Sequence, residues 1–305
     1  FPLFFPERRG FFLEGTTVFD FARETGNTIV PFFSRRIGLD ANGAPQRIDY
    51  GAKITGRIGA NDIGLIHVRT AGSDQLIGED FTVVRTRKRF FLQSYAGMIN
   101  TRRAERKTTA PGRQTAGVDF VLSTSRFRGS RNLELSGYYP WNTRPGIDSR
   151  RAAYGFRLDH SNEPWDAHVS VREIQPGYDP AMGFVDRSNV RAYRPALGYT
   201  FRPKNTSVVR SLSFDSIFDV YTDLHNRLLT RDWDYKVFHL QFQSGDNFQV
   251  HVLPTYERLE NDFEISKGIT LPGGSAYSFI RYSVQVQTSN RRIIQVHPKY
   301  EVGNF

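Results

Sequence analysis

The sequence predicts an all-β protein, an antiparallel transmembrane β-barrel with about 14 visible strands. Apolar and polar residues alternate with a period of two over long segments, and the connections between these segments alternate between short and long. Hydrophobic residues make up only 39% of the chain, whereas aromatic residues reach 14%. Apolar residues on only one face of each strand, with girdles of aromatic residues around the molecule, are typical of a barrel in a membrane.

The first 47 residues contain Phe, Pro, Gly and Arg without a period, and we expect an irregular lead-in at the periplasmic mouth or in the lumen. Each buried aromatic side chain contributes about 1.5–3 kcal/mol, so the phenylalanines should pack against the inner wall or a preceding domain. We expect the acidic side chains, Glu24 among them, to pair with charges on the wall. A simple structural lead-in that closes the base of the barrel is an equal alternative. The motif of this segment comprises Phe5, Pro6, Glu7, Arg8, Phe11, Phe12 and Glu14.

The barrel is predicted over residues 48–305, with strands of roughly 8–14 residues, long enough to cross a bilayer at a tilt. The segment 48–58, IDYGAKITGRI, sets apolar residues against Lys53 and Arg57. The same alternation returns in RPALGYTFR, VFHLQFQ, IRYSVQVQ and IQVHPKYEV. The residues predicted to contact lipid are Leu197, Tyr199, Phe201, Phe238, Leu240, Phe242, Ile280, Tyr282, Val284 and Val286.

Polar residues of the opposite parity are predicted to face the lumen, where they must be hydrated or paired with one another. A structural network of arginine–carboxylate pairs and a role in selectivity are both consistent with this pattern. The lumen-facing candidates are Lys53, Arg57, Arg69, Asp119, Arg157, Asp159, Arg172, Arg194, Arg202, Asp215, His239, His251, Arg281, His297 and Lys299.

The connections predict which rim of the barrel faces outward. Short ones contain GAND, SNEP, SGDN and SN, and the longer ones reach the length of 175–189 and 258–274. Long loops outside and short turns in the periplasm are typical of outer-membrane barrels. A soluble β-sandwich or β-propeller is the alternative, but sandwich strands are shorter and a propeller would show a repeat near 40–50 residues.

Several motifs between Phe1 and about Pro203 resemble the conserved barrel region of the DUF5916 family, the first two of them the segment that opens it. They are FPLFFPERRGFFLEG, FFSRRIG, IDYGAKITGRIG, DFTVVRTRKRF, GVDF, YDPAMGFVDRSNVR and FRP. The resemblance implies a bacterial outer-membrane β-barrel of uncharacterised function, often preceded by a carbohydrate-binding-module-like domain. Members usually continue with further strands, so the barrel is expected to be incomplete at residue 305.

Composition and motifs restrict the function. The net charge is +10, but the basic residues are spread along the chain, so nucleic acid is not an expected partner. Cysteine is absent, which excludes disulfides and thiolate metal sites, and no stretch approaches about 18 apolar residues. No catalytic motif is present, so we expect no enzyme, cofactor or metal site, although a hydrolase with Ser and His on its wall stays open.

The predicted protein is therefore an outer-membrane channel or transporter with a partly occluded lumen. Saccharides or other nutrients are the solutes that the resemblance suggests. The alternative is a structural or interaction barrel that anchors or threads a partner protein through the outer membrane. The expected partners are outer-membrane lipid and a periplasmic or surface protein.

Overall fold

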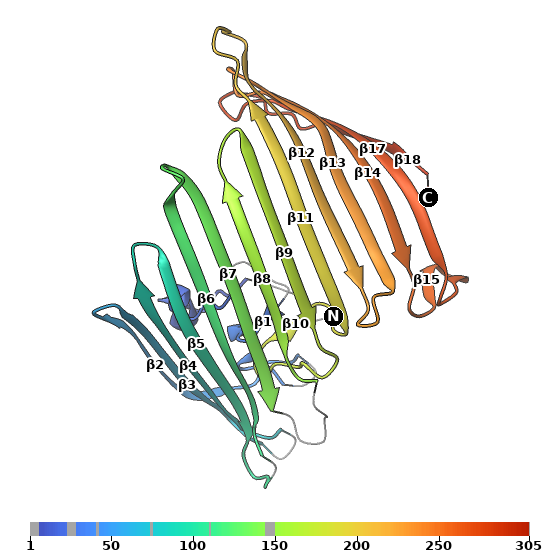
Figure 1. The fold of residues 1–305 in the computed structure, drawn as a ribbon. Coiled ribbons are helices and arrows are strands. Elements are labelled where there is room, and N and C mark those ends of the chain that lie inside the picture. The colour runs from blue at the N-terminus through green and yellow to red at the C-terminus, as the bar shows by residue number, and fades with distance from the viewer. Residues whose placement is uncertain are drawn as a thin grey trace. The chain divides into compact units, whose positions relative to one another are not determined.

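The computed structural model describes residues 6–22, 29–40, 43–73, 76–109, 111–143 and 150–304. The fold is all-β and is dominated by one antiparallel sheet of 14 strands, which confirms the predicted class and strand number. Chain order is kept across the sheet, and only β10, β15 and β16 lie outside it among the strands after β2 (Figure 1).

The strands of the sheet have lengths between 5 and 15 residues. They are β2 (Ile48–Ile58), β3 (Asn61–Thr70), β4 (Glu79–Phe90), β5 (Ser94–Glu105), β6 (Arg113–Phe127), β7 (Arg131–Thr143), β8 (Ala153–Ser161), β9 (Trp165–Ile174), β11 (Val190–Phe201), β12 (Val209–Thr222), β13 (Leu228–Phe242), β14 (Asn247–Arg258), β17 (Ala276–Gln287) and β18 (Lys299–Gly303). The other elements are α1 (Gly10–Leu13), η1 (Thr16–Val18), β1 (Ile29–Val30), η3 (Ser34–Arg36), β10 (Phe184–Val185), β15 (Phe263–Ser266) and β16 (Ile269–Leu271).

The sheet is not closed into a barrel within the described residues. Its two edge strands are β2 and β18, and these pair with β3 and β17 respectively. The predicted antiparallel sheet is thus present, and closure is not. No helix in the described part of the chain is long and apolar enough to cross a membrane.

The chain divides into two compact units, which we describe separately. Unit 1 comprises residues 1–124, 135–156 and 173–189, and unit 2 comprises residues 125–134, 157–172 and 190–305. The lead-in belongs to unit 1 together with β2–β5 and most of β6.

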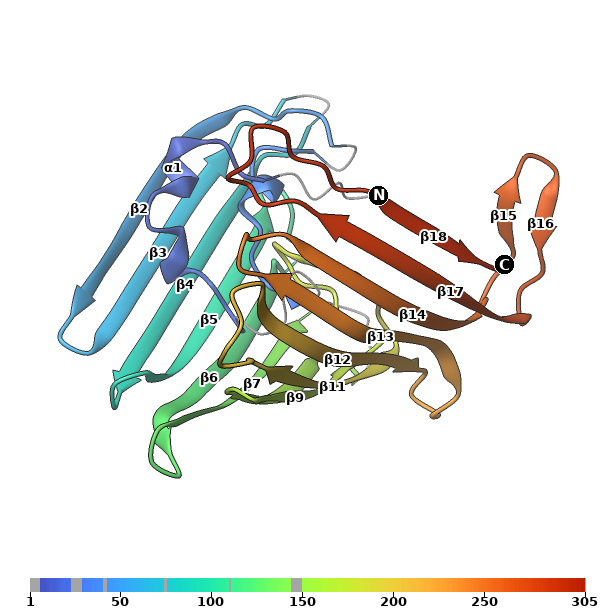
Figure 2. The ribbon, with the colours of Figure 1, turned by 90° about the horizontal axis from the view of Figure 1, so that it is seen from above.

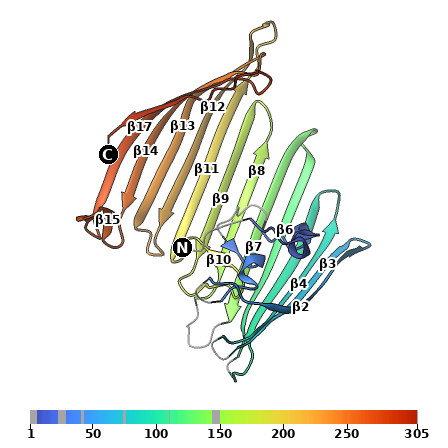
Figure 3. The ribbon, with the colours of Figure 1, turned by 180° about the vertical axis from the view of Figure 1, so that it is seen from behind.

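The core of unit 1 lies between the lead-in and one face of its strands. The loop 175–189 joins this core, because β10 pairs with β1 and Met182 forms a bridge with Phe32. Figure 2 shows α1 beside β2 and β3, and Figure 3 shows the sheet from behind with the lead-in in blue. The buried core residues are Phe12, Phe19, Ile37, Ile66, Val68, Phe81, Val83, Ile99, Ala181 and Met182.

The lead-in enters the sheet at the end that carries the long connections. The backbone amide of Ala71, just after β3, donates to the Arg47 carbonyl at 2.8 Å, and the Gln46 amide side chain donates to the Ala71 and Ile77 carbonyls. In an antiparallel sheet, the connections after β3, β5, β7 and β9 all lie at this same end. The lead-in and the long connections therefore lie at the same end of the sheet. The expectation of a lead-in at the periplasmic mouth and the expectation of long loops on the outside cannot both be correct.

Unit 2 has two chemically different faces. Register places Tyr282 beside Val252 and Val284 beside Val250 on one face, and Ser283 beside His251 on the other. We call the first the aromatic face and the second the polar face. Several predicted lipid-facing side chains on the aromatic face are strongly exposed, including Leu197 at 52% and Tyr282 at 52%.

Candidate functional site

The segment RTRKR in β4 places three arginines on the face of unit 1 that the lead-in covers. Successive side chains of a strand alternate between faces, so Arg85, Arg87 and Arg89 follow Phe81 and Val83 of the core. We call this the covered face. These three arginines were not among the predicted site residues. Their spacing of two along the sequence could have indicated that they share one face of a strand.

The pair of Arg85 and Asp119 is the most deeply buried charged contact of the covered face. The guanidinium donates to both carboxylate oxygens at 2.6 and 2.8 Å, and both side chains are 0% exposed. Tyr95 and the Ala22 backbone amide also donate to Asp119, at 3.2 and 3.1 Å. The predicted site residue Asp119 thus connects the wall to the lead-in.

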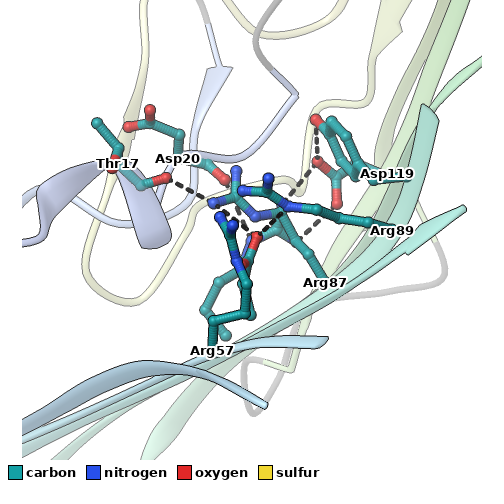
Figure 4. A network of polar contacts seen from close by, with 9 residues as sticks. Thr17, Asp20, Arg57, Arg87, Arg89 and Asp119 are labelled. Atoms are coloured by element: carbon teal, nitrogen blue, oxygen red, sulfur yellow. Dashed lines mark hydrogen bonds and ion pairs between the residues drawn. The ribbon is translucent and has the colours of Figure 1, made fainter. Parts of the chain in front are cut away.

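Cationic side chains of the wall hold the lead-in through its backbone carbonyls. Arg85 donates to the Asp20 carbonyl at 3.1 Å and Arg87 to the Thr17 carbonyl at 3.0 Å (Figure 4). Lys53 donates to the Phe11 carbonyl and, at 2.7 Å, to the Glu14 carbonyl. These contacts therefore depend on where the backbone of the lead-in runs and not on its side chains.

The acidic side chains of the lead-in take a smaller part than expected. Glu14 approaches Lys53 at 4.0 Å, whereas Glu7 pairs with Arg9 at 2.8 Å and accepts from Ser34, both within the lead-in. Burial alone would raise the pKa of Glu7, but the hydrogen bonds from Arg9 and Ser34 lower it to about 2.

Pro6 and Arg8 complete the described part of the predicted motif. Arg8 is exposed, and the Pro6 carbonyl accepts from Arg35 at 3.1 Å. Phe5 and Glu24 lie outside the described residues.

Three glycines of the covered face receive phenylalanine rings from the lead-in. A Cβ on Gly64 would lie 2.8 Å from the Phe19 ring, and one on Gly117 would lie 2.8 Å from the Phe21 ring. At Gly51 the distance to the Phe11 ring would be 3.3 Å. The sequence showed glycines inside strands, where they often mark a close approach, but not which segment approaches.

Three arginines lie close to Asp62 on the covered face, at the end of the sheet that carries the short turn between β2 and β3. Arg57 and Arg89 each donate through Nε at 2.8 Å, to different carboxylate oxygens, and Arg87 lies 3.6 Å away (Figure 4). The Asp62 side chain is only 5% exposed. Arg57, a predicted site residue, therefore belongs to a cluster that contains more cations than anions.

Most of the predicted polar residues in unit 2 are paired with a carboxylate. Their N–O distances range from 2.5 to 3.3 Å. The pairs are Arg157–Asp159, Arg194–Asp219, Arg202–Glu163, Asp215–Lys236, His251–Asp234, Arg281–Glu301 and Lys299–Glu301.

Three other candidates have no carboxylate contact of this kind in the part of the chain that the structure describes. Arg172 donates to the Tyr221 hydroxyl at 2.9 Å. The buried Nε2 of His239 has no hydrogen-bond partner among the described residues, and His297 is exposed in the connection before β18. The polar face of unit 2 is thus mainly a network of ion pairs.

Arg69 departs from the predicted facing. Register places it beside Tyr50 and Asp80, on the opposite face from Arg57 and Asp62. It pairs with Asp80 at 2.6 Å, and its guanidinium carbon lies 5.4 Å from the centre of the Tyr50 ring. Both faces of β3 carry apolar residues, so alternation alone could not assign this strand.

The described residues contain no group of three or more His, Cys, Asp or Glu side chains that could hold a metal ion. No family model, curated protein or solved structure matches the chain. The resemblance to the DUF5916 family therefore stays a prediction, and the functional argument rests on the geometry of the two faces.

Proposed function

We propose that this chain forms the wall of a β-barrel in a bacterial outer membrane, with the aromatic face of unit 2 toward lipid and its polar face toward the lumen. The observation that carries the proposal is the contrast between these two faces along adjacent strands. Exposed Tyr282 and Val284 flank Ser283, which is 1% exposed, on a single strand. Large apolar side chains that stay exposed along a sheet indicate a contact surface, here proposed to be lipid.

A membrane location places a strict demand on the edges of the sheet. Backbone N–H and C=O groups need partners in the hydrocarbon region, where water is absent. Within the proposal, β2 and β18 must therefore pair with each other or with further strands.

The lead-in supports a partly occluded lumen rather than an open pore. It fills the covered face of unit 1 with a core and is held there by the buried Arg85–Asp119 pair. We propose a channel or transporter of restricted flux, and the resemblance stated above suggests saccharides or other nutrients as solutes. The firm attachment of the lead-in also favours a second candidate, a barrel that anchors or threads a partner protein.

Membrane residence is tested by fractionation of cells that express the chain. The proposal predicts recovery in the outer-membrane fraction, extraction only with detergent, and gel migration that changes on boiling. Recovery of a folded monomer from the soluble fraction would contradict it.

Measurements of conductance distinguish a channel or transporter from a barrel that anchors or threads a partner. Deletion of residues 1–30 should raise single-channel conductance in planar bilayers if the lead-in restricts a conducting lumen. If neither the full chain nor the deletion variant conducts, the anchoring or threading function is favoured. An intact protein that already conducts like an open porin would contradict occlusion.

A further inference from the structure

The arginine cluster around Asp62 carries an excess of positive charge. Arg57, Arg87 and Arg89 face the single carboxylate of Asp62, so the four side chains together have a charge of +2. The neighbouring Arg85 adds nothing to this excess, because Asp119 neutralises it in a separate buried pair. An uncompensated pair of guanidinium charges favours the binding of an anion.

The cluster also retains unused hydrogen-bond donors. Arg57 and Arg89 contact Asp62 through Nε, and the described residues provide no further hydrogen-bond partner for their terminal nitrogens. Their side chains are 56% and 47% exposed, so a solute can reach these nitrogens.

The carboxylate of Asp62 fixes the spacing of the two exposed guanidinium groups. Arg57 bonds to one carboxylate oxygen and Arg89 to the other, so the two groups flank Asp62 from β2 and β4. Arg87, whose Nη2 lies 3.6 Å from Asp62, is held by the Thr17 carbonyl. These contacts position the donors before any ligand arrives, which reduces the entropy cost of binding.

We propose that this cluster binds a tetrahedral dianion, either free phosphate or the phosphate group of a solute. Two excess positive charges balance such a dianion, and the planar fork of arginine matches the geometry of phosphate oxygens. This inference rests on the cluster alone and does not require the membrane location proposed above.

Calorimetric titration of the full chain in detergent with inorganic phosphate tests the inference. We expect saturable binding that weakens as salt concentration rises, and at least about tenfold weaker binding in the R57Q/R89Q variant, since charge-assisted hydrogen bonds are lost. Lys88→Gln is the matched control, because it removes one charge from the exposed, opposite side of the same strand and should leave binding unchanged.

A second variant removes the risk that Asp62, left with Arg87 alone, destabilises the protein. R57Q/D62N/R89Q leaves no uncompensated carboxylate and should also lose phosphate binding. Tighter binding of methyl phosphate than of inorganic phosphate would identify a phosphorylated solute, and equal or weaker binding would identify free phosphate. Absence of binding to the unaltered chain, or undiminished binding to both variants, would overturn the inference.

Discussion

The covered face of unit 1 and the polar face of unit 2 differ in how they satisfy their charged residues. In unit 1, the wall uses Arg85, Arg87 and Lys53 to hold a segment of the same chain by its backbone carbonyls. In unit 2, the charged residues pair mainly with one another, as Arg194 does with Asp219. Arginines of both faces pair with carboxylates, but on the covered face Arg85 and Arg87 also donate to the backbone of the lead-in.

The difference follows from what lies between the charges. The covered face contains Ile66, Val83 and Ile99, which need an apolar partner and find it in the phenylalanines of the lead-in. The polar face of unit 2 presents residues such as Ser283, Gln285 and Gln249 between its ion pairs. The covered face thus differs from the polar face of unit 2 by its continuous cluster of buried apolar residues, which packs against the lead-in.

The largest effect is expected from breaking the buried pair in unit 1. Asp119→Ala should lower the free energy of unfolding by about 3–5 kcal/mol, because it leaves Arg85 buried without a counter-charge. Urea unfolding in detergent measures this. Arg202→Gln in unit 2 breaks a pair whose side chains are both about half exposed, and it should change stability much less. Equal losses would remove the distinction between the two units.

A smaller effect is expected from a charge on the aromatic face of unit 2. Tyr282→Arg should cost about 2–4 kcal/mol in a bilayer, because the side chain lies near the middle of β17 and would contact hydrocarbon. Gln285→Arg, on the polar face of the same strand, is the control and should cost clearly less. Similar costs at both positions in unfolding from lipid vesicles would contradict the assignment of the faces.

The glycines that receive the lead-in give the next effect. Gly64→Val and Gly117→Val should each destabilise unit 1 by about 1–3 kcal/mol, because the added side chain overlaps the Phe19 or Phe21 ring. Both should also expose residues 6–22 to protease. Gly56→Val is the matched control in β2, since a Cβ there meets nothing within 4 Å. Unchanged protease protection in the two variants would show that the rings do not depend on these glycines.

The smallest effect concerns pH and the attachment of the lead-in. The pKa of Glu7 is lowered from its ordinary value of 4.5 to about 2, so its stabilising contribution is complete above pH 4.5 and is lost as pH falls toward 2. Protease protection of the lead-in should decline over this range, and Glu7→Gln should make the decline shallower.

A carboxylate of unit 2 provides the control for this pH dependence. Hydrogen bonds from Arg292 and from the Ser289 backbone amide lower the pKa of Asp246, which lies in the turn between β13 and β14. Asp246→Asn should leave the protection of the lead-in unchanged. A response to Asp246→Asn equal to that of Glu7→Gln would mean that the pH effect is not local.

The sequence predicted the strands better than it predicted their partners. Alternation identified the long strands of unit 2 because apolar residues predominate on one face there and polar residues on the other. It failed for Arg69 because β3 carries Leu65 on one face and Ile66 on the other, which leaves its parity undefined. Closure of the sheet was also expected, and the structure leaves β2 and β18 as edges.

The lead-in shows a different limit of sequence reasoning. Its phenylalanines predicted burial against the wall, and the structure places Phe12 and Phe19 in the core. Charge pairing was expected between side chains of the lead-in and the wall. The cationic side chains of the wall instead donate mainly to backbone carbonyls of the lead-in, and these are the same for every residue type. Wall glycines such as Gly64 and Gly117 could be located in the sequence. Which phenylalanine ring packs against each glycine could not be predicted, because it depends on the path of the lead-in.

Spin labels along β17 show whether the aromatic face of unit 2 contacts lipid. The chain has no cysteine, so single substitutions at positions 280–286 accept a nitroxide label without background. In lipid vesicles, we predict high collision rates with oxygen at positions 280, 282, 284 and 286, and low rates at 281, 283 and 285. A water-soluble nickel chelate should not reach the first set. Equal oxygen accessibility at all seven positions, or access of the nickel chelate to the first set, would contradict the account.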